Sequence, residues 1–93
     1  MIEKHILFED IDPLLLYGVN NANMQMLKAL YPKLRIVARD NIIKALGDDN
    51  ELERFGRVID LLKEYCNKYN SLNEEAIIDA VNGKRGDRVG YGS

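Results

Sequence analysis

Residues 34–47 read LRIVARDNIIKALG, and this stretch decides the fold. Apolar and polar positions alternate through residues 34–39, which is typical of a β-strand with one face buried. Asp40 and Asn41 form a plausible two-residue turn, because both tolerate left-handed backbone angles. Residues 42–46 are then the partner strand, closed by Gly47. We therefore expect a β-hairpin here, the most local strand pairing in the chain.

One strand and two helices are predicted before the hairpin. Residues 2–9 alternate roughly with period two, which indicates an N-terminal strand. Asp12 is placed to N-cap a short helix, and Gly18 suits the left-handed position at its end. A second helix follows, with Asn20 or Asn21 as its cap and with apolar residues at helical spacing.

Two helices are predicted after the hairpin. Asp48 begins a long helix that runs to about Tyr69, and Gly56 inside it would permit close approach of another element. Ser71 is the predicted cap of a last helix, which ends at Asn82. The order is β-α-α-β-β-α-α. We expect an α+β two-layer sandwich, with a three-stranded sheet covered by helices on one face.

Length and composition restrict the function. The chain has 93 residues, 46% hydrophobic and 30% charged, which fits one small globular domain. We assign residues 1–82 to this domain and residues 83–93, which hold four of the seven glycines, to a tail or linker. The single cysteine, Cys66, excludes an internal disulfide and favours a cytoplasmic protein. No apolar run reaches the roughly 20 residues of a membrane helix, and the single histidine, His5, cannot form a His-rich metal site.

The net charge of -2 conceals a basic region. Residues 18–47 contain five lysines and arginines against one acid, Asp40, which gives a local charge of +4. Arg35 and Arg39 have the same strand parity, so both should face solvent. These cations could bind phosphates, or they could be the solvated face of a half-buried hairpin.

The polar and aromatic residues of the region also have two interpretations. Asn20, Asn21 and Asn23 can cap and turn the chain, or contact a ligand. Tyr17 and Tyr31 can stack on bases, but helix-end tyrosines more often belong to the edge of a core.

The element order is similar to the type I arrangement of KH domains. These modules bind single-stranded nucleic acid, and a GxxG loop between their first two helices contacts its backbone. The corresponding segment here is Gly18-Val19-Asn20-Asn21, which keeps the first glycine and has Asn21 in place of the second. The resemblance implies that this loop contacts a nucleic-acid backbone.

Three segments resemble, more narrowly, the N-terminal domain of the PhoH-like ATPases. They are YGVNNAN at residues 17–23, LRIVARDN at residues 34–41 and LGD at residues 46–48. Asp40 stands where that family has glycine. The resemblance extends over residues 2–82. In the family a P-loop ATPase domain follows this module, so ATP and Mg are implied for that domain of the parent protein. This chain has no Walker A motif, and we expect neither an enzyme nor a cofactor of its own.

We therefore expect a non-catalytic accessory module that contacts RNA or single-stranded nucleic acid and acts with a PhoH-like ATPase core in cis. The candidate contact residues are Gly18, Asn20, Asn21, Asn23, Lys28, Arg35, Arg39 and Lys44. The alternative is a protein-interaction or oligomerisation module that docks on the ATPase core or forms a homo-oligomer, without nucleic acid. In that case residues 2–8 or 42–46 would offer an exposed strand edge.

Overall fold

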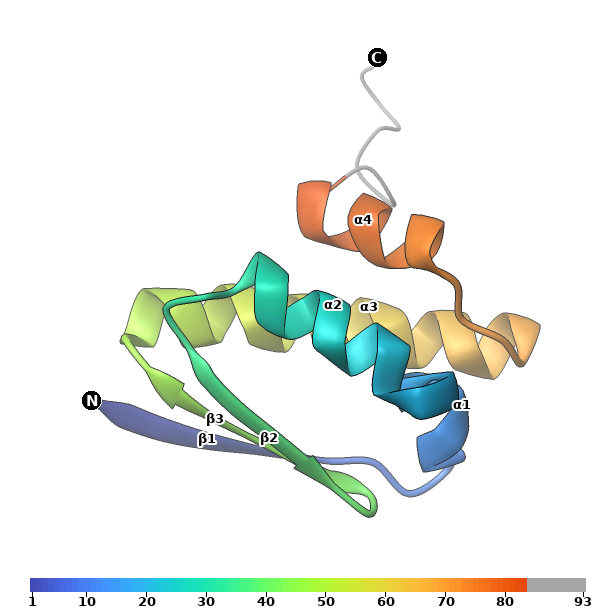
Figure 1. Cartoon of the computed structure of the whole chain (residues 1–93), viewed down its shortest axis with the longest axis horizontal. Helices are drawn as coiled ribbons and strands as arrows, with labels where there is room; N and C mark the ends of the chain where they lie inside the picture. Colours follow the sequence, from blue (N-terminus) through green and yellow to red (C-terminus); the bar gives the residue numbers. More distant parts are fainter. Residues whose placement is uncertain (84–93) are drawn as a thin grey trace.

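The structure is a computed structural model that describes residues 1–83 (Figure 1). Its elements in chain order are β1 (Ile2–Leu7), α1 (Pro13–Tyr17), the 3-10 helix η1 (Val19–Asn21), α2 (Ala22–Leu30), β2 (Arg35–Arg39), β3 (Ile42–Gly47), α3 (Asp49–Tyr69) and α4 (Glu74–Asn82). The predicted order of strands and helices is confirmed, with η1 as an addition. The predicted tail lies outside the described residues, except for Gly83, which ends α4 with a φ of 74°.

The three strands form one antiparallel sheet in the order β1-β3-β2. The strand that comes last in the sequence is therefore central, and β1 and β2 are the two edges. This corrects the expectation that residues 42–46 offer a free edge, because β3 pairs on both sides. Residues 2–8 do contain an edge strand.

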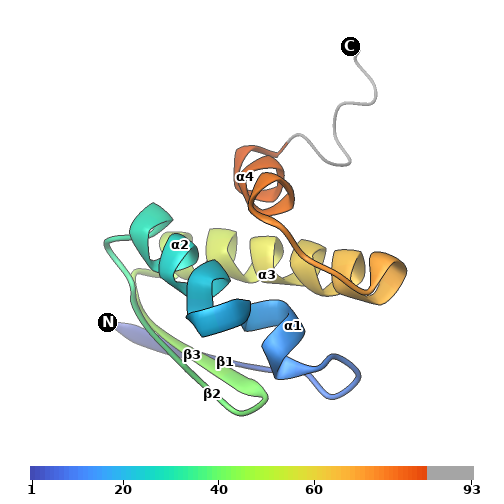
Figure 2. The ribbon, with the colours of Figure 1, turned by 45° about the vertical axis from the view of Figure 1, so that its right-hand side comes forward.

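The helices lie on one side of the sheet (Figures 1 and 2). Helix α3 packs over β1 and β3, and α2 packs beside β2. Helix α4 contacts only α2 and α3, on the side away from the sheet (Figure 1). The molecule is thus an α+β domain whose last helix is stacked on the helical layer.

The core lies between the sheet and the helices. Ile36 and Ile43 point inward from the sheet and are buried, as are Phe55, Ile59 and Leu62 of α3. Buried and more exposed residues alternate along β2 and β3, which confirms the predicted inner and outer faces of the hairpin. Burial of these side chains is the main stabilising contribution, roughly 1.5–3 kcal/mol for each large apolar side chain.

The hairpin turn is held against the helical layer by Tyr17. Its hydroxyl lies 2.9 Å from the carbonyl oxygen of Asp40 and 3.3 Å from that of Ile42, and donates to them. Its ring packs edge-to-face on Phe8, with 5.8 Å between ring centroids. Asp40 takes a φ of 49° in the turn, as predicted, whereas Asn41 has no positive φ. Helix α1 and the hairpin tip therefore form one packed unit.

The helix ends differ in detail from the prediction. Asp12 caps α1 as expected, accepting a hydrogen bond from the Leu14 N–H at 3.0 Å. The cap of α4 is Asn73, whose side chain accepts from the Ala76 N–H at 2.8 Å, so the prediction of Ser71 is wrong. Leu30, one of the apolar residues at helical spacing in α2, is 40% exposed. Within residues 1–83, no helix has both the length and the apolar character that crossing a membrane requires.

Candidate nucleic-acid interface

The sheet has an open outer face that no helix of the described region covers. It is formed by alternate residues of the three strands, in three cross-strand rows: Glu3, Leu46 and Arg35; His5, Lys44 and Val37; Leu7, Ile42 and Arg39. The residues between them on β2 and β3 point into the core.

Three of the predicted contact residues lie together on this outer face. Arg35 and Arg39 are on β2 and Lys44 is on β3, and all three are exposed. None of them forms an ion pair within residues 1–83, whereas Arg54 and Arg57 of α3 are paired with glutamates. Glu3 is the one acid among the nine residues of this face, against three cations, and its Oε2 lies 3.4 Å from the Nε2 of His5, which is charged only when protonated. The outer face therefore carries unneutralised positive charge.

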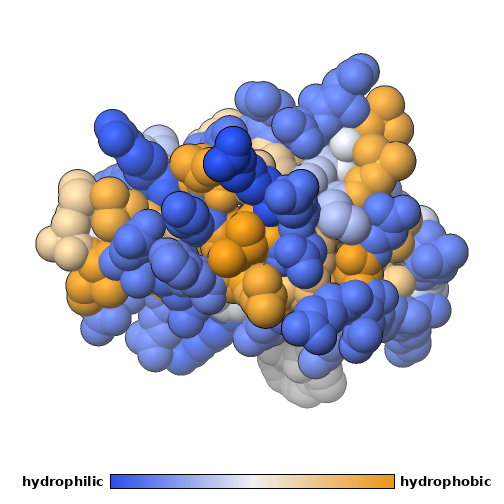
Figure 3. Space-filling model, turned by 90° about the horizontal axis from the view of Figure 1, so that it is seen from below, coloured by the Kyte–Doolittle hydropathy of each residue, from blue (hydrophilic) through white to orange (hydrophobic). Residues whose placement is uncertain are grey.

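Apolar side chains lie among these cations. Leu7 is 54% and Val37 47% exposed, and orange apolar atoms alternate with blue polar ones in the view from below (Figure 3). A shallow pocket of about 160 Å³ lies on this face, lined by Glu3, Arg35, Val37, Lys44, Ala45 and Leu46. A surface with both cations and apolar groups can hold a phosphate and a base at the same time.

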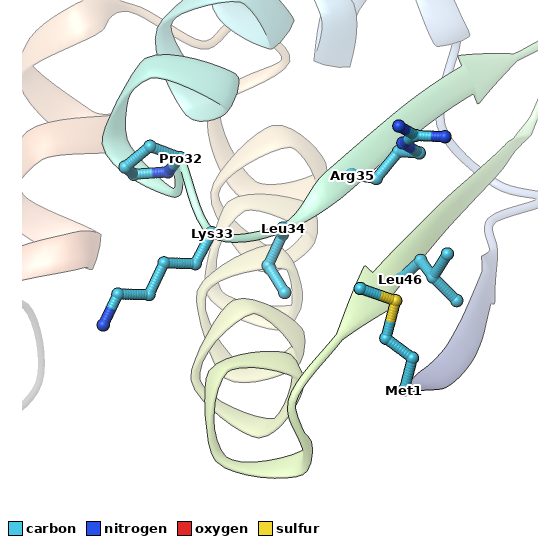
Figure 4. A pocket seen from close by; sticks show the side chains of 6 residues that line it. All are labelled: Met1, Pro32, Lys33, Leu34, Arg35 and Leu46. Carbon is cyan, nitrogen blue, oxygen red and sulfur yellow. The ribbon is translucent and has the colours of Figure 1, made fainter.

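A wider pocket of about 590 Å³ opens at the start of β2 (Figure 4). Its lining residues are Met1, Pro32, Lys33, Leu34, Arg35 and Leu46. The side chains of Lys33 and Arg35 extend in different directions, with Leu34 between them (Figure 4). The pocket continues the amphipathic outer face to the end of the sheet. Lys33 was not among the predicted contact residues, although it belongs to the basic region 18–47.

The loop between α1 and α2 has an unusual backbone. Gly18, Asn20 and Asn21 have φ values of 87°, 57° and 61°. Glycine and asparagine are the residues that adopt such angles at least cost. Asn21 is the N-cap residue of α2, as predicted, but its side chain makes no capping hydrogen bond. Helix α2 therefore begins without a side-chain cap, and the side chains of Asn20 and Asn21 are exposed.

Asn23 lies behind this loop and not on its surface. It is the one buried polar residue among those described, at 5% exposure, and its amide donates to the carbonyl oxygen of Leu16 at 3.3 Å. A Cβ atom on Gly18 would lie 2.9 Å from the Asn23 Cγ. Asn23 thus fixes the loop to the end of α1, and only a glycine fits against it.

The predicted contact residues therefore occupy two surfaces. The loop residues and Lys28, which is exposed in the last turn of α2, belong to the helical layer. Arg35, Arg39 and Lys44 point away from that layer, on the opposite face of the sheet. The structure brings the three sheet cations together and separates them from the loop.

The two tyrosines considered for base stacking are core residues. Tyr17 is 8% and Tyr31 6% exposed. Burial raises the pKa of both phenols, with a smaller contribution from Asp40 at Tyr17. Tyr31 packs edge-to-face on Phe55, with 5.5 Å between ring centroids. Neither ring offers an open face to a base.

In the described part of the chain, no group of three or more His, Cys, Asp or Glu side chains is arranged to hold a metal ion. Comparison with protein-family models, with curated proteins and with solved structures gave no match. The two surfaces described above are therefore the structural basis for a function.

Proposed function

We propose that this domain is a KH-like, non-catalytic module that binds RNA or another single-stranded nucleic acid, as the N-terminal part of a PhoH-like ATPase. The open face of the sheet is the main contact surface. The resemblance in the sequence suggests the parent protein, and the element order is compatible with it. The parent would supply the ATP and Mg site.

The observation that carries this proposal is the cluster of Arg35, Arg39 and Lys44 on one exposed face. Their charges are not neutralised by any described residue, in a chain whose net charge is negative. Arg35 and Arg39 lie four residues apart on β2, about 13 Å along the strand, and Lys44 lies between them on the adjacent strand, opposite Val37. The three cations can therefore contact separate phosphates of one strand.

The loop is the second point of contact in this proposal. Helix α2 begins without a side-chain cap, and the Ala22 N–H already donates to the Val19 carbonyl, so the contact would come from the exposed side chains of the loop. Asn20 and Asn21 expose amides beside it. Val37, Leu46 and the pocket at the start of β2 supply the apolar contacts for bases. Because the cations contact phosphates, binding should show little base preference.

The first prediction concerns the salt dependence of binding. Labelled single-stranded RNA is titrated with the chain at several salt concentrations, and fluorescence anisotropy is measured. Three phosphate contacts predict a slope of log K against log salt of about -2 for a single strand. The double variant Arg35→Glu, Arg39→Glu should weaken binding at least about tenfold and flatten that slope, since two contacts become repulsive.

The matched control is Arg54→Glu with Lys68→Glu, which changes the net charge equally on α3. Both residues are exposed and lie outside the sheet face. If this control weakens binding as much as the sheet variant does, the sheet face is not the binding surface. If the wild-type chain fails to bind at low salt, the proposed function is wrong for this domain. The double variant Asn20→Gly, Asn21→Gly keeps the loop backbone accessible. It tests whether the two side-chain amides contribute to binding.

A further inference from the structure

The free edge of β1 forms one side of a groove whose other side is α3. The groove has a volume of about 470 Å³. Its lining residues are Lys4, His5, Ile6, Leu7, Glu53, Gly56, Arg57, Asp60 and Lys63. It lies at the opposite edge of the sheet from Arg35 and Arg39 of β2, and shares only His5 and Leu7 with the outer face described above.

The edge of β1 presents unpaired main-chain groups. The Phe8 N–H donates to the Asn41 carbonyl at 3.0 Å, so main-chain groups of the even-numbered residues of β1 point toward β3. Those of Glu3, His5 and Leu7 consequently point outward, because successive residues of a strand alternate. Within residues 1–83 no strand pairs with them. Such an edge is a template for one more strand.

The charges on the groove side of α3 are self-complementary. Glu53, Arg57, Asp60 and Lys63 give the order negative, positive, negative, positive. Read in the opposite direction, the same series is positive, negative, positive, negative. An antiparallel copy of α3 would therefore place Glu53 opposite the partner's Lys63, and Arg57 opposite the partner's Asp60. The centre of this pattern lies near residue 58.

The same two-fold axis suits β1. An antiparallel pairing centred on Lys4 places Glu3 opposite the partner's His5 and Ile2 opposite the partner's Ile6, with each face of the sheet preserved. The outward N–H and C=O groups of Glu3 and His5 would then form the intermolecular hydrogen bonds. The two facing lysines lie in a groove that also contains Glu53 and Asp60.

The two centres coincide in space. The Lys4 Cε lies 3.0 Å from the position of a Cβ on Gly56, so the middle of β1 is adjacent to the middle of the charged series on α3. Strands in a sheet are about 4.8 Å apart. Since α3 packs over β1 and β3, the axis beside β1 would hold the two α3 helices roughly 10 Å apart, which is a normal packing distance.

We propose that the groove binds a second copy of this chain. The two β1 strands pair across a two-fold axis, the two sheets join into one, and the α3 helices pack antiparallel with alternating charges matched. This interface is independent of the proposed nucleic-acid binding.

The experiment measures the dimer dissociation constant by sedimentation equilibrium at low salt, without nucleic acid. Arg57→Asp and Asp60→Arg should each raise it at least about tenfold, because each creates two facing pairs of like charge. The double variant Arg57→Asp, Asp60→Arg exchanges the partners of both pairs and should restore dimerisation. An equimolar mixture of the two single variants should form heterodimers.

Arg54→Asp is the matched control, because Arg54 lies on α3 outside the groove and should leave the constant unchanged. His5→Pro removes an outward N–H of β1. This variant should be monomeric by sedimentation equilibrium and remain folded by circular dichroism. A wild-type chain that stays monomeric at millimolar concentration would overturn the proposal. The proposal would also be overturned if the double variant did not restore dimerisation, or if Arg54→Asp raised the dimer dissociation constant as much as the groove variants do.

Discussion

Gly18 is the residue on which the loop between α1 and α2 depends. Its φ of 87° and ψ of 166° lie in a region that is nearly restricted to glycine. Its missing side chain also leaves the space that Asn23 fills. Backbone geometry and packing therefore both select glycine at this position, independently of any ligand.

Gly18→Ala should lower the free energy of unfolding by at least about 2 kcal/mol, since it adds backbone strain to a steric clash. Urea unfolding followed by circular dichroism measures this. The same substitution in an Asn23→Ala background measures the side-chain part of the clash, because the backbone strain and the 3.0 Å approach to the nitrogen of residue 23 remain there. The exposed neighbour Val19 provides the control, and Val19→Ala should change little. Equal stability of Gly18→Ala and the wild type would contradict this account.

At the residue scale, the alternation of residues 34–39 predicted the outer face of β2, because a period of two directly encodes which side each residue faces. The role of the asparagines could not be predicted in the same way. An asparagine can cap a helix through its side chain or adopt a left-handed backbone, and these uses compete. The packing of Asn23 against Gly18 decides the outcome, and this contact is tertiary.

Among the elements, α3 contains a glycine where a helix would favour alanine. Gly56 is buried beneath the side chain of Lys4. This agrees with the prediction that another element approaches the helix closely at this glycine. The nearest atom to an added Cβ is the Lys4 Cε at 3.0 Å, near the end of a flexible chain that can move.

Gly56→Ala should therefore stabilise the domain by up to about 1 kcal/mol, since alanine is the better helix former and the lysine can shift. Thermal unfolding at low protein concentration measures this. In a Lys4→Ala background the gain should be slightly larger, because no side chain has to move. A loss of stability that disappears in this background would instead show that Lys4 is held rigidly in place.

The helix N-caps show how far neighbouring residues alone can predict where a helix begins. The cap at Asp12 was predicted because Pro13 follows it, and this pair permits few other structures. Ser71 and Asn73 are both good caps, and Asn73 is used because its carboxamide accepts from the Ala76 N–H. Helix α3 ends at Tyr69, and its C-cap Asn70 has a φ of 55°. This end point decides which of the two residues caps α4.

The stability of the whole molecule should depend on pH through Cys66. The thiol is buried in α3, and burial raises its pKa from 9.0 to about 11. A raised pKa means that the unfolded chain loses its proton first. This contribution to stability is complete below pH 9 and is lost as the pH rises toward 11.

Between pH 8 and pH 10 the wild type should therefore lose about 1 kcal/mol more unfolding free energy than Cys66→Ala does. Urea unfolding at both pH values measures the difference. The alanine variant shares the tyrosines, whose raised pKa values affect both proteins equally, so the comparison isolates the thiol. Parallel pH profiles would show that the thiol is accessible to water in the native state.

At the scale of the molecule, the strand order was the main feature beyond the reach of the sequence patterns. The hairpin was predicted from local alternation, but the pairing of β1 with β3 depends on contacts about 40 residues apart. One feature of the sequence did indicate the central position of β3. Ile42 and Leu46 are partly buried on the outer face, because β3 has a neighbour on each side. The apolar character of both faces of β3 was consistent with a central strand.

The central position of β3 has a consequence for the synthesis of the protein. While the ribosome is translating the first 41 residues, neither β1 nor β2 has a hydrogen-bonding partner, since each pairs only with β3. The sheet can assemble only after Gly47 has left the exit tunnel, and its covering helix, which directly follows Gly47, emerges later still. Until then the nascent chain exposes two unpaired strands, which chaperones on the ribosome would be expected to bind.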